Sequence, residues 1–214
     1  MGKIKDLIKD LIGEPKPSKI VVLDPATAEE LTVLQGEPEM RIVGLFTDVA
    51  EEKIAELIHA MLYLNETNRL QDSEDKKRPI EFYISTNGGA ADDMFGMYDM
   101  MRMIREETEI HTIGVGKVMS AGVLLLAAGT KGKRKIGKYC RVMIHSVSGG
   151  GHGALPTVIN ELEAIQQIQE EYINALVSET KMTNKSIKKM LQRKVNIYLS
   201  AEEAVELGIA DIII

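Results

Sequence analysis

The stretch from His111 to Gly129, HTIGVGKVMSAGVLLLAAG, decides the fold that the sequence predicts. Its first five residues form a β-type strand, the next four form a turn, and Ser120 begins an apolar helix. The same order occurs upstream, where the strand Pro79–Ile84 leads through the turn Ser85–Gly89 into the helix Ala90–Arg105. Strands that alternate with helices predict an α/β domain with a parallel sheet, and both turns are expected at its carboxyl edge.

Ser120 and His145 are the candidate catalytic pair at this edge. As the first residue of a helix, Ser120 places its hydroxyl where free backbone N–H groups favour developing negative charge. His145 ends the strand-like run Arg141–Ile144, and residues at strand ends commonly project into clefts. The serine is therefore a candidate nucleophile and the histidine a candidate base. The alternatives are that the serine only caps the helix and that the histidine is a surface residue.

The glycines before the upstream helix allow two interpretations. Gly88-Gly89 could hold a phosphate, but the chain lacks the lysine spacing of a P-loop and the pattern G-x-G-x-x-G. The second interpretation is an oxyanion hole, in which the N–H groups of Gly89 and Ala121 converge on one point. No histidine has a partner four residues away that would indicate metal binding, so no metal site is predicted.

Composition and charge exclude several classes of protein. The 214 residues are enough for one domain with its own core, and no apolar run is long enough to span a bilayer, so no membrane partner is expected. A net charge of −6 argues against a nucleic-acid partner, and the basic run Lys131–Lys135 is interpreted as a solvated turn. Cys140, the single cysteine, is interpreted as a small core residue, and its isolation fits a reducing compartment such as the cytoplasm.

The first residues of the chain form a separate segment. Apolar side chains recur there on one face of a short amphipathic helix, which Gly13 ends. The run Glu14–Ser18 follows and has the composition of a linker. We therefore predict an N-terminal arm and linker over residues 1–18 and a single domain over residues 19–214.

Several motifs occur in an order that is typical of one family. They are Ser85-Thr86-Asn87-Gly88-Gly89, Ser120-Ala121-Gly122, Leu125-Leu126-Ala127-Ala128-Gly129-Thr130-Lys131-Gly132-Lys133-Arg134, Arg141-Val142-Met143-Ile144-His145 and Leu199-Ser200-Ala201-Glu202-Glu203-Ala204-Val205-Glu206-Leu207-Gly208. Over about residues 41–214 the chain thus resembles the proteolytic subunit of the Clp protease. The resemblance implies a crotonase-like fold of repeated ββα units, with a protruding handle helix over about residues 146–180.

The resemblance also implies an activity and a set of roles. The chain is expected to be a serine endopeptidase, with Ser120 as nucleophile, His145 as general base, and Gly89 and Ala121 as oxyanion donors. It is expected to need no cofactor, because an AAA+ unfoldase of the Clp family binds the ATP and feeds unfolded polypeptides into the protease. The implied assembly is a tetradecamer of two stacked heptameric rings, in the cytoplasm or a plastid-like compartment. The residues implied to hold substrate by main-chain pairing are Gly149, Gly150 and Gly151.

One departure from the family pattern concerns the third member of the triad. The family's aspartate lies two residues before an aromatic residue, here Tyr198, so Asn196 occupies its position. Asparagine can accept a hydrogen bond from histidine but supplies no charge, which predicts reduced activity. Two alternatives stay open. One is a weakly active or structural subunit within a ring, and the other is acyl-CoA chemistry on the same fold, which also uses paired N–H donors.

Overall fold

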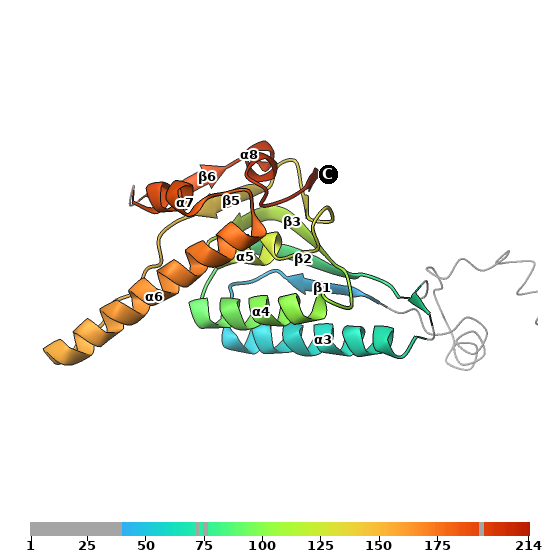
Figure 1. Cartoon of the computed structure of the whole chain (residues 1–214), viewed down its shortest axis with the longest axis horizontal. Helices are drawn as coiled ribbons and strands as arrows, with labels where there is room; N and C mark the ends of the chain where they lie inside the picture. Colours follow the sequence, from blue (N-terminus) through green and yellow to red (C-terminus); the bar gives the residue numbers. More distant parts are fainter. Residues whose placement is uncertain (1–39, 72, 75–76, 193–194) are drawn as a thin grey trace, which may run out of the picture. The chain divides into compact units, whose positions relative to one another are not determined.

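A seven-stranded sheet forms the centre of the computed structural model, which describes residues 40–214 except 72, 75–76 and 193–194 (Figure 1). The predicted arm, residues 1–18, and the start of the predicted domain lie outside the described residues. The strands are β1 (Ile42–Leu45), β2 (Ile80–Thr86), β3 (Ile110–Met119), β4 (Lys135–Ile136), β5 (Arg141–Ile144), β6 (Ile197–Leu199) and β7 (Ile212–Ile213). The helices are α3 (Glu51–Arg69), α4 (Ala91–Ile104), α5 (Ala121–Ala127), α6 (Leu155–Glu179), α7 (Asn184–Leu191) and α8 (Ala201–Glu206).

Parallel pairing dominates the sheet, as the alternation of strands and helices predicts. The main order is β1-β2-β3-β4-β7 with every neighbouring pair parallel, and β5 branches from β3 in parallel and carries β6 antiparallel. The predicted α/β class is therefore confirmed. Since β2 and β3 run in the same direction, the turns that follow them lie at one edge of the sheet.

The long strand β3 corrects one expectation. Residues Lys117–Met119 pair with Arg141–Met143 of β5, so the predicted turn Gly116–Met119 is wrong and the chain turns only at Ser120. Pairing with β5 satisfies the backbone groups of these residues, which keeps them in a strand despite the glycine. Gly116 itself has φ of 67°, a conformation that glycine adopts at little cost.

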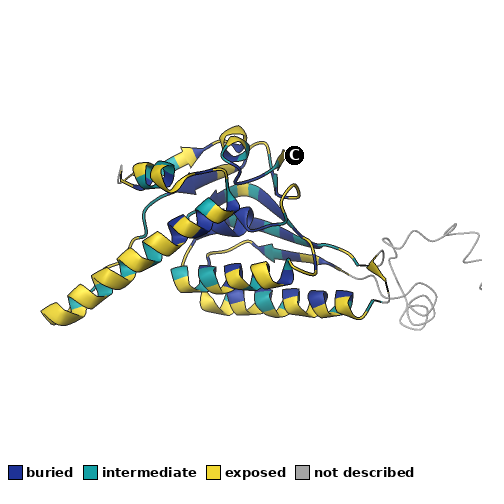
Figure 2. Ribbon diagram, in the orientation of Figure 1, coloured by how far each residue is buried: buried dark blue, intermediate teal, exposed yellow. Residues whose placement is uncertain are grey.

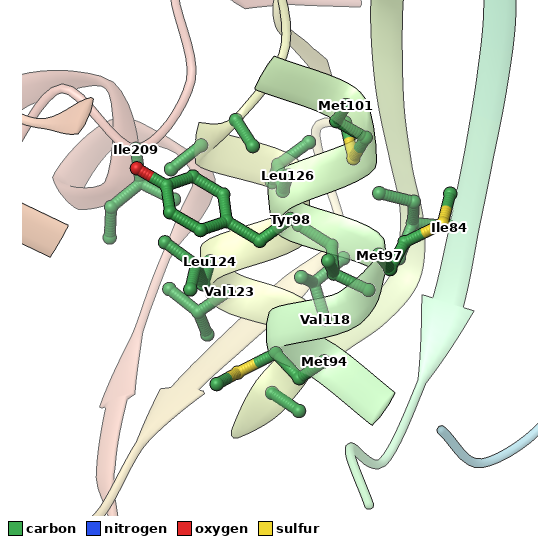
Figure 3. Packing of buried hydrophobic residues seen from close by; sticks show 14 of the residues in the cluster. Ile84, Met94, Met97, Tyr98, Met101, Val118, Val123, Leu124, Leu126 and Ile209 are labelled. Atoms are coloured by element: carbon green, nitrogen blue, oxygen red, sulfur yellow. The ribbon is translucent and has the colours of Figure 1, made fainter. Parts of the chain in front are cut away.

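The core lies between the sheet and the helices, where the strands are largely buried (Figure 2). Figure 3 shows how α4 and α5 pack within it, with methionine side chains from α4 beside leucine and valine side chains from α5. Flexible methionines fill irregular gaps in a core that contains few aromatic rings. The residues of this packing are Ile84, Met94, Met97, Tyr98, Met101, Val118, Val123, Leu124, Leu126 and Ile209.

Helix α6 begins at Leu155 and extends away from the sheet (Figure 1). Only its C-terminal part is buried, from Tyr172 onward, whereas Leu155, Ile159 and Leu162 are exposed. It lies within the range of about 146–180 predicted for the handle helix, but residues 146–154 are not helical. Within the described part of the chain, no helix combines the length and apolar character that crossing a membrane requires.

A buried ion cluster holds the C-terminal end of α6. The carboxylate of Glu179 is 4% exposed and lies 2.9 Å from Arg105 Nη2 and 2.8 Å from Lys131 Nζ. Burial by itself would raise the pKa of Glu179, but hydrogen bonds and charge from Arg105 and Lys131 outweigh it, and the pKa lies below its ordinary value.

This cluster corrects the interpretation of Lys131–Lys135 as a solvated turn at one residue, Arg134, whereas Lys131, Gly132 and Lys133 are exposed as predicted. Arg134 is buried, pairs with Asp211 at 2.6 Å and donates to the backbone carbonyl of Glu179 at 2.8 Å. The reason is that the acidic partner of Arg134, Asp211, comes from a sequence-distant segment, so the charge of this one residue is neutralised inside the fold instead of by water.

Candidate active site

Strand pairing brings Ser120 and His145 together. Met119 at the end of β3 lies opposite Met143 of β5, and Ser120 and His145 follow at the same edge. The backbone N–H of Ser120 donates to the carbonyl of Met143 at 2.8 Å. Ser120 Oγ and His145 Nε2 are 2.7 Å apart, which is within hydrogen-bond distance.

The conformation of Ser120 bears on the alternative that it only caps the helix. Its side chain makes no capping hydrogen bond to α5 and contacts His145 instead. Its φ is 54°, and among the described residues it is the one non-glycine residue with positive φ. Such a conformation is strained by about 1–3 kcal/mol, and persists only where the surrounding structure enforces it. The geometry is that of a serine held for contact with histidine rather than of a simple cap.

The glycine turn after β2 packs directly against this serine. A Cβ atom on Gly88 would lie 2.5 Å from Ser120 Cβ and 3.1 Å from the backbone nitrogen of Ala121. The two turns are thus in contact, as their common sheet edge predicts. From the sequence, Gly88 was considered only as part of a possible phosphate site with Gly89, and its contact with Ser120 was not predicted.

Gly89 is held by a bridge to a segment before α3. Val49 N–H donates to the carbonyl of Gly88 at 2.7 Å, and Ala90 N–H donates to the carbonyl of Val49 at 2.9 Å. Neither bond uses the N–H of Gly89, so the bridge fixes the residue and leaves this donor for a ligand. A Cβ on Gly89 would lie 2.0 Å from the carbonyl oxygen of Val49, so only glycine fits.

A cavity of about 320 Å³ contains the pair and both predicted oxyanion donors. Its volume suits one or two side chains of a bound peptide. His145 and Tyr172 are the titratable side chains in its wall, and burial raises the pKa of Tyr172. The lining residues are Asn87, Gly89, Ala90, Ala91, Met94, Ser120, Ala121, His145, Ser146, Val147, Ser148, Ile168 and Tyr172.

Asn196 lies near His145 without bonding to it. Ile144 of β5 pairs with Ile197 of β6, and continuing this antiparallel register by one step places Asn196 opposite His145. Asn196 is exposed, and within the described residues no hydrogen bond joins its side chain to the imidazole. Its role as the orienting residue therefore stays a prediction.

The predicted substrate segment Gly149–Gly151 lies beside α6 and outside the cavity wall. A Cβ on Gly149 would meet Ile165 at 2.9 Å, and one on Gly151 would meet Glu161. The segment before it, Ser146–Ser148, lines the cavity instead. Substrate pairing with these glycines stays a prediction as well.

In the described part of the chain, no three histidine, cysteine, aspartate or glutamate side chains are grouped so that they could hold a metal ion. Cys140 is buried, as expected of a core residue. Burial raises the pKa of its thiol to about 11, so it is protonated near neutral pH and is a poor nucleophile.

Comparisons with known proteins agree with this geometry. The model of the Clp protease family matches residues 29–214. The chain is 33% identical over 174 residues to ATP-dependent Clp protease proteolytic subunit 1 of Prochlorococcus marinus (strain MIT 9312), covering 81% of this chain and 84% of the relative. It is 33% identical over 171 residues to the ATP-dependent Clp protease proteolytic subunit of Oltmannsiellopsis viridis, covering 80% and 82%. The chain therefore belongs to the Clp protease family.

Proposed function

We propose that this chain is a serine endopeptidase and the proteolytic subunit of an ATP-dependent Clp protease. The observation that carries the proposal is the 2.7 Å distance between Ser120 Oγ and His145 Nε2 inside a cavity that also contains Gly89 and Ala121. The names of the similar proteins support the same activity. Acyl-CoA chemistry on this fold does not need a serine that is hydrogen-bonded to a histidine, so the presence of this pair favours peptide hydrolysis.

In the first half of the reaction, Ser120 Oγ attacks the carbonyl carbon of the scissile bond while His145 Nε2 accepts the hydroxyl proton. A C–O bond forms, and the carbonyl electrons move onto oxygen. The N–H groups of Gly89 and Ala121 donate to this oxyanion, in a site that needs no reorganisation at the moment of reaction. The C–N bond then breaks, and the imidazolium gives its proton to the leaving amine.

In the second half, water attacks the ester carbon of the acyl-enzyme, and His145 accepts one proton of the water. The same two N–H groups stabilise the second oxyanion. Collapse of this intermediate breaks the bond to Ser120 Oγ, His145 returns the proton to the serine, and a peptide with a new carboxyl terminus leaves.

The proposed assembly is two stacked heptameric rings that enclose the cavities and receive unfolded polypeptide from an AAA+ unfoldase of the Clp family. The exposed apolar positions Leu155, Ile159 and Leu162 of α6 support a contact between rings, because such a stripe is typical of a helix that packs against a partner. We place the protein in the cytoplasm or a plastid-like compartment, since its single cysteine suits reducing conditions.

Labelling of the assembled protein with a fluorophosphonate tests the proposed activity. We expect covalent labelling and peptide hydrolysis, both lost in Ser120→Ala. The control is Ser178→Ala, which removes a serine of α6 that lies outside the cavity wall and should still be labelled. A well-folded oligomer that neither labels nor hydrolyses peptides would contradict the proposal and favour a structural subunit.

We further propose that Asn196 orients the imidazole of His145. Support comes from the β5–β6 register, whose last pair is Ile144 with Ile197 and which, continued by one step, would set Asn196 opposite His145 with both side chains on one face. An amide can hold the ring but cannot stabilise the imidazolium with a charge. Replacement of the triad aspartate by asparagine in a serine protease lowers kcat by about 10⁴.

The variant Asn196→Asp tests this role. We expect kcat for a short peptide to rise by roughly tenfold or more, because a carboxylate would stabilise the charged imidazole. Asn184→Asp adds the same charge at the start of α7 and should leave kcat unchanged. Equal rates for Asn196→Asp and the wild type would contradict the expected gain from a charged partner and mean either that the amide of Asn196 suffices or that another group orients His145.

A further inference from the structure

Tyr172 connects α6 to the backbone of the proposed nucleophile. The residue is 4% exposed and forms part of the cavity wall. Its hydroxyl donates to the backbone carbonyl oxygen of Ser120 at 3.1 Å. The same carbonyl accepts from the N–H of Val123 at 3.0 Å, within the first turn of α5. Of these two donors to the Ser120 carbonyl, Val123 belongs to α5 itself, whereas Tyr172 belongs to α6.

The carbonyl of Ser120 belongs to the same peptide unit as the N–H of Ala121. The described residues contain no cis peptide bond, so this unit is trans and planar, and its C=O and N–H point in opposite directions. A donor that holds the carbonyl on one side thus directs the N–H to the other. The strained φ of Ser120 makes this orientation costly to maintain without outside contacts.

We propose that Tyr172 is a positioning residue that aims the Ala121 N–H into the oxyanion hole by holding the carbonyl of Ser120. The proposal deepens the proposed peptidase function and rests on it. Because burial raises the pKa of Tyr172, the phenol stays protonated and remains a donor throughout the neutral range. Its hydrogen bond also polarises the peptide unit, which strengthens the N–H as a donor on the opposite side.

The substitution Tyr172→Phe tests the proposal, because it keeps the ring and removes only the hydroxyl. We expect kcat for a fluorogenic peptide to fall by about 3- to 10-fold, the loss of one neutral hydrogen bond, with KM unchanged. The kcat effect arises because the negative charge on oxygen is absent from the bound substrate and develops only in the transition state that leads to the tetrahedral intermediate. Affinity for a peptide boronate, whose tetrahedral adduct resembles that state, should fall by the same factor.

Tyr98→Phe is the matched control. Tyr98 is also buried, and its hydroxyl bonds to Glu179 at 3.1 Å near the end of α6 rather than to the nucleophile. Figure 3 shows its ring packed among the apolar side chains of the core. Tyr98→Phe should lower the free energy of unfolding, while kcat and the affinity for the peptide boronate stay at wild-type values. Unchanged kcat in Tyr172→Phe, or an equal loss of kcat in both variants, would overturn the proposal.

Crystal structures of the wild type and Tyr172→Phe separate this proposal from the proposed function. If the wild type hydrolyses no peptide and takes no serine label, the proposed peptidase activity fails. The role of Tyr172 is then decided by the peptide unit between Ser120 and Ala121. We expect this unit to rotate, or to occupy two orientations, in the variant. An unchanged orientation together with an unchanged φ of Ser120 would overturn the positioning role.

Discussion

Replacement of Gly88 by alanine should damage the active site more than it damages the fold. The new Cβ would lie 2.5 Å from Ser120 Cβ and 2.9 Å from the backbone oxygen of Met119. An ordinary van der Waals contact begins near 3.4 Å, so the turn that carries Ser120 must move by about 1 Å, and a misplacement of about this size can cost 10²-fold in rate. We therefore expect kcat to fall by about 100-fold.

The stability cost of the same change has two parts. Gly88 has φ of 101°, and an alanine forced into the left-handed region costs about 1–2 kcal/mol. Crowding against backbone atoms adds about 1–3 kcal/mol, as overpacking usually does. Gly132→Ala separates the two parts, because Gly132 has φ of 82° and nothing lies within 4 Å of its added Cβ. The control should lose about 1–2 kcal/mol and keep its kcat.

Peptide hydrolysis and urea unfolding at one fixed protein concentration measure both effects, since oligomerisation makes stability depend on concentration. Gly88→Ala should show lower kcat and a larger loss of unfolding free energy than Gly132→Ala. The reasoning is refuted if Gly88→Ala hydrolyses peptides at the wild-type rate and is no less stable than the control. Contact between the two turns would then not constrain the nucleophile.

Two further variants concern stability. Glu179→Gln should lower the free energy of unfolding by about 2–4 kcal/mol at pH 7, because it leaves Arg105 and Lys131 without their carboxylate. The pKa of Glu179 is lowered in the folded state, so the carboxylate stabilises the fold fully above pH 4.5 and loses this effect as the pH falls through the folded pKa. The free energy of unfolding in urea, measured at pH 7 and pH 4, should therefore depend less on pH in Glu179→Gln than in the wild type. An equal pH dependence in both proteins would contradict this role of Glu179. Ser200→Ala should lower the free energy of unfolding in urea by about 1 kcal/mol, because Ser200 Oγ caps α8 by accepting from Glu203 N–H at 3.2 Å. Ser200→Asp should keep most of that stability, because aspartate is also a good N-cap residue. An equal loss in both variants would contradict the capping role of Ser200.

The fold class was predictable because its signals are local. Alternating strand and helix patterns, with glycine turns between them, depend on residues close together in the chain. The proximity of Ser120 and His145 also followed, since both end strands that a parallel sheet brings to one edge. The turn predicted at Gly116–Met119 was wrong because pairing with β5, a contact between distant segments, outweighed the local turn signal.

Contacts between distant residues explain the rest of what sequence reasoning missed. Arg134 looked like part of a solvated basic run, yet Asp211, far along the chain, neutralises it within the fold. Tyr172 carried no signal at all, because an aromatic residue on the apolar face of a helix is usually a core residue. Only the position of α6 against α5 brings its hydroxyl to Ser120.

The sequence by itself therefore determined the α/β class, the position of the Gly88-Gly89 turn after a strand and the candidate pair of serine and histidine, because periodicity and strand ends are local properties. Tertiary structure alone decided the positive φ of Ser120, the fit of Gly88 against it and the hydrogen bond from Tyr172. The physical reason is that these features depend on distances between side chains and backbone groups that become neighbours only when the helices pack against the sheet.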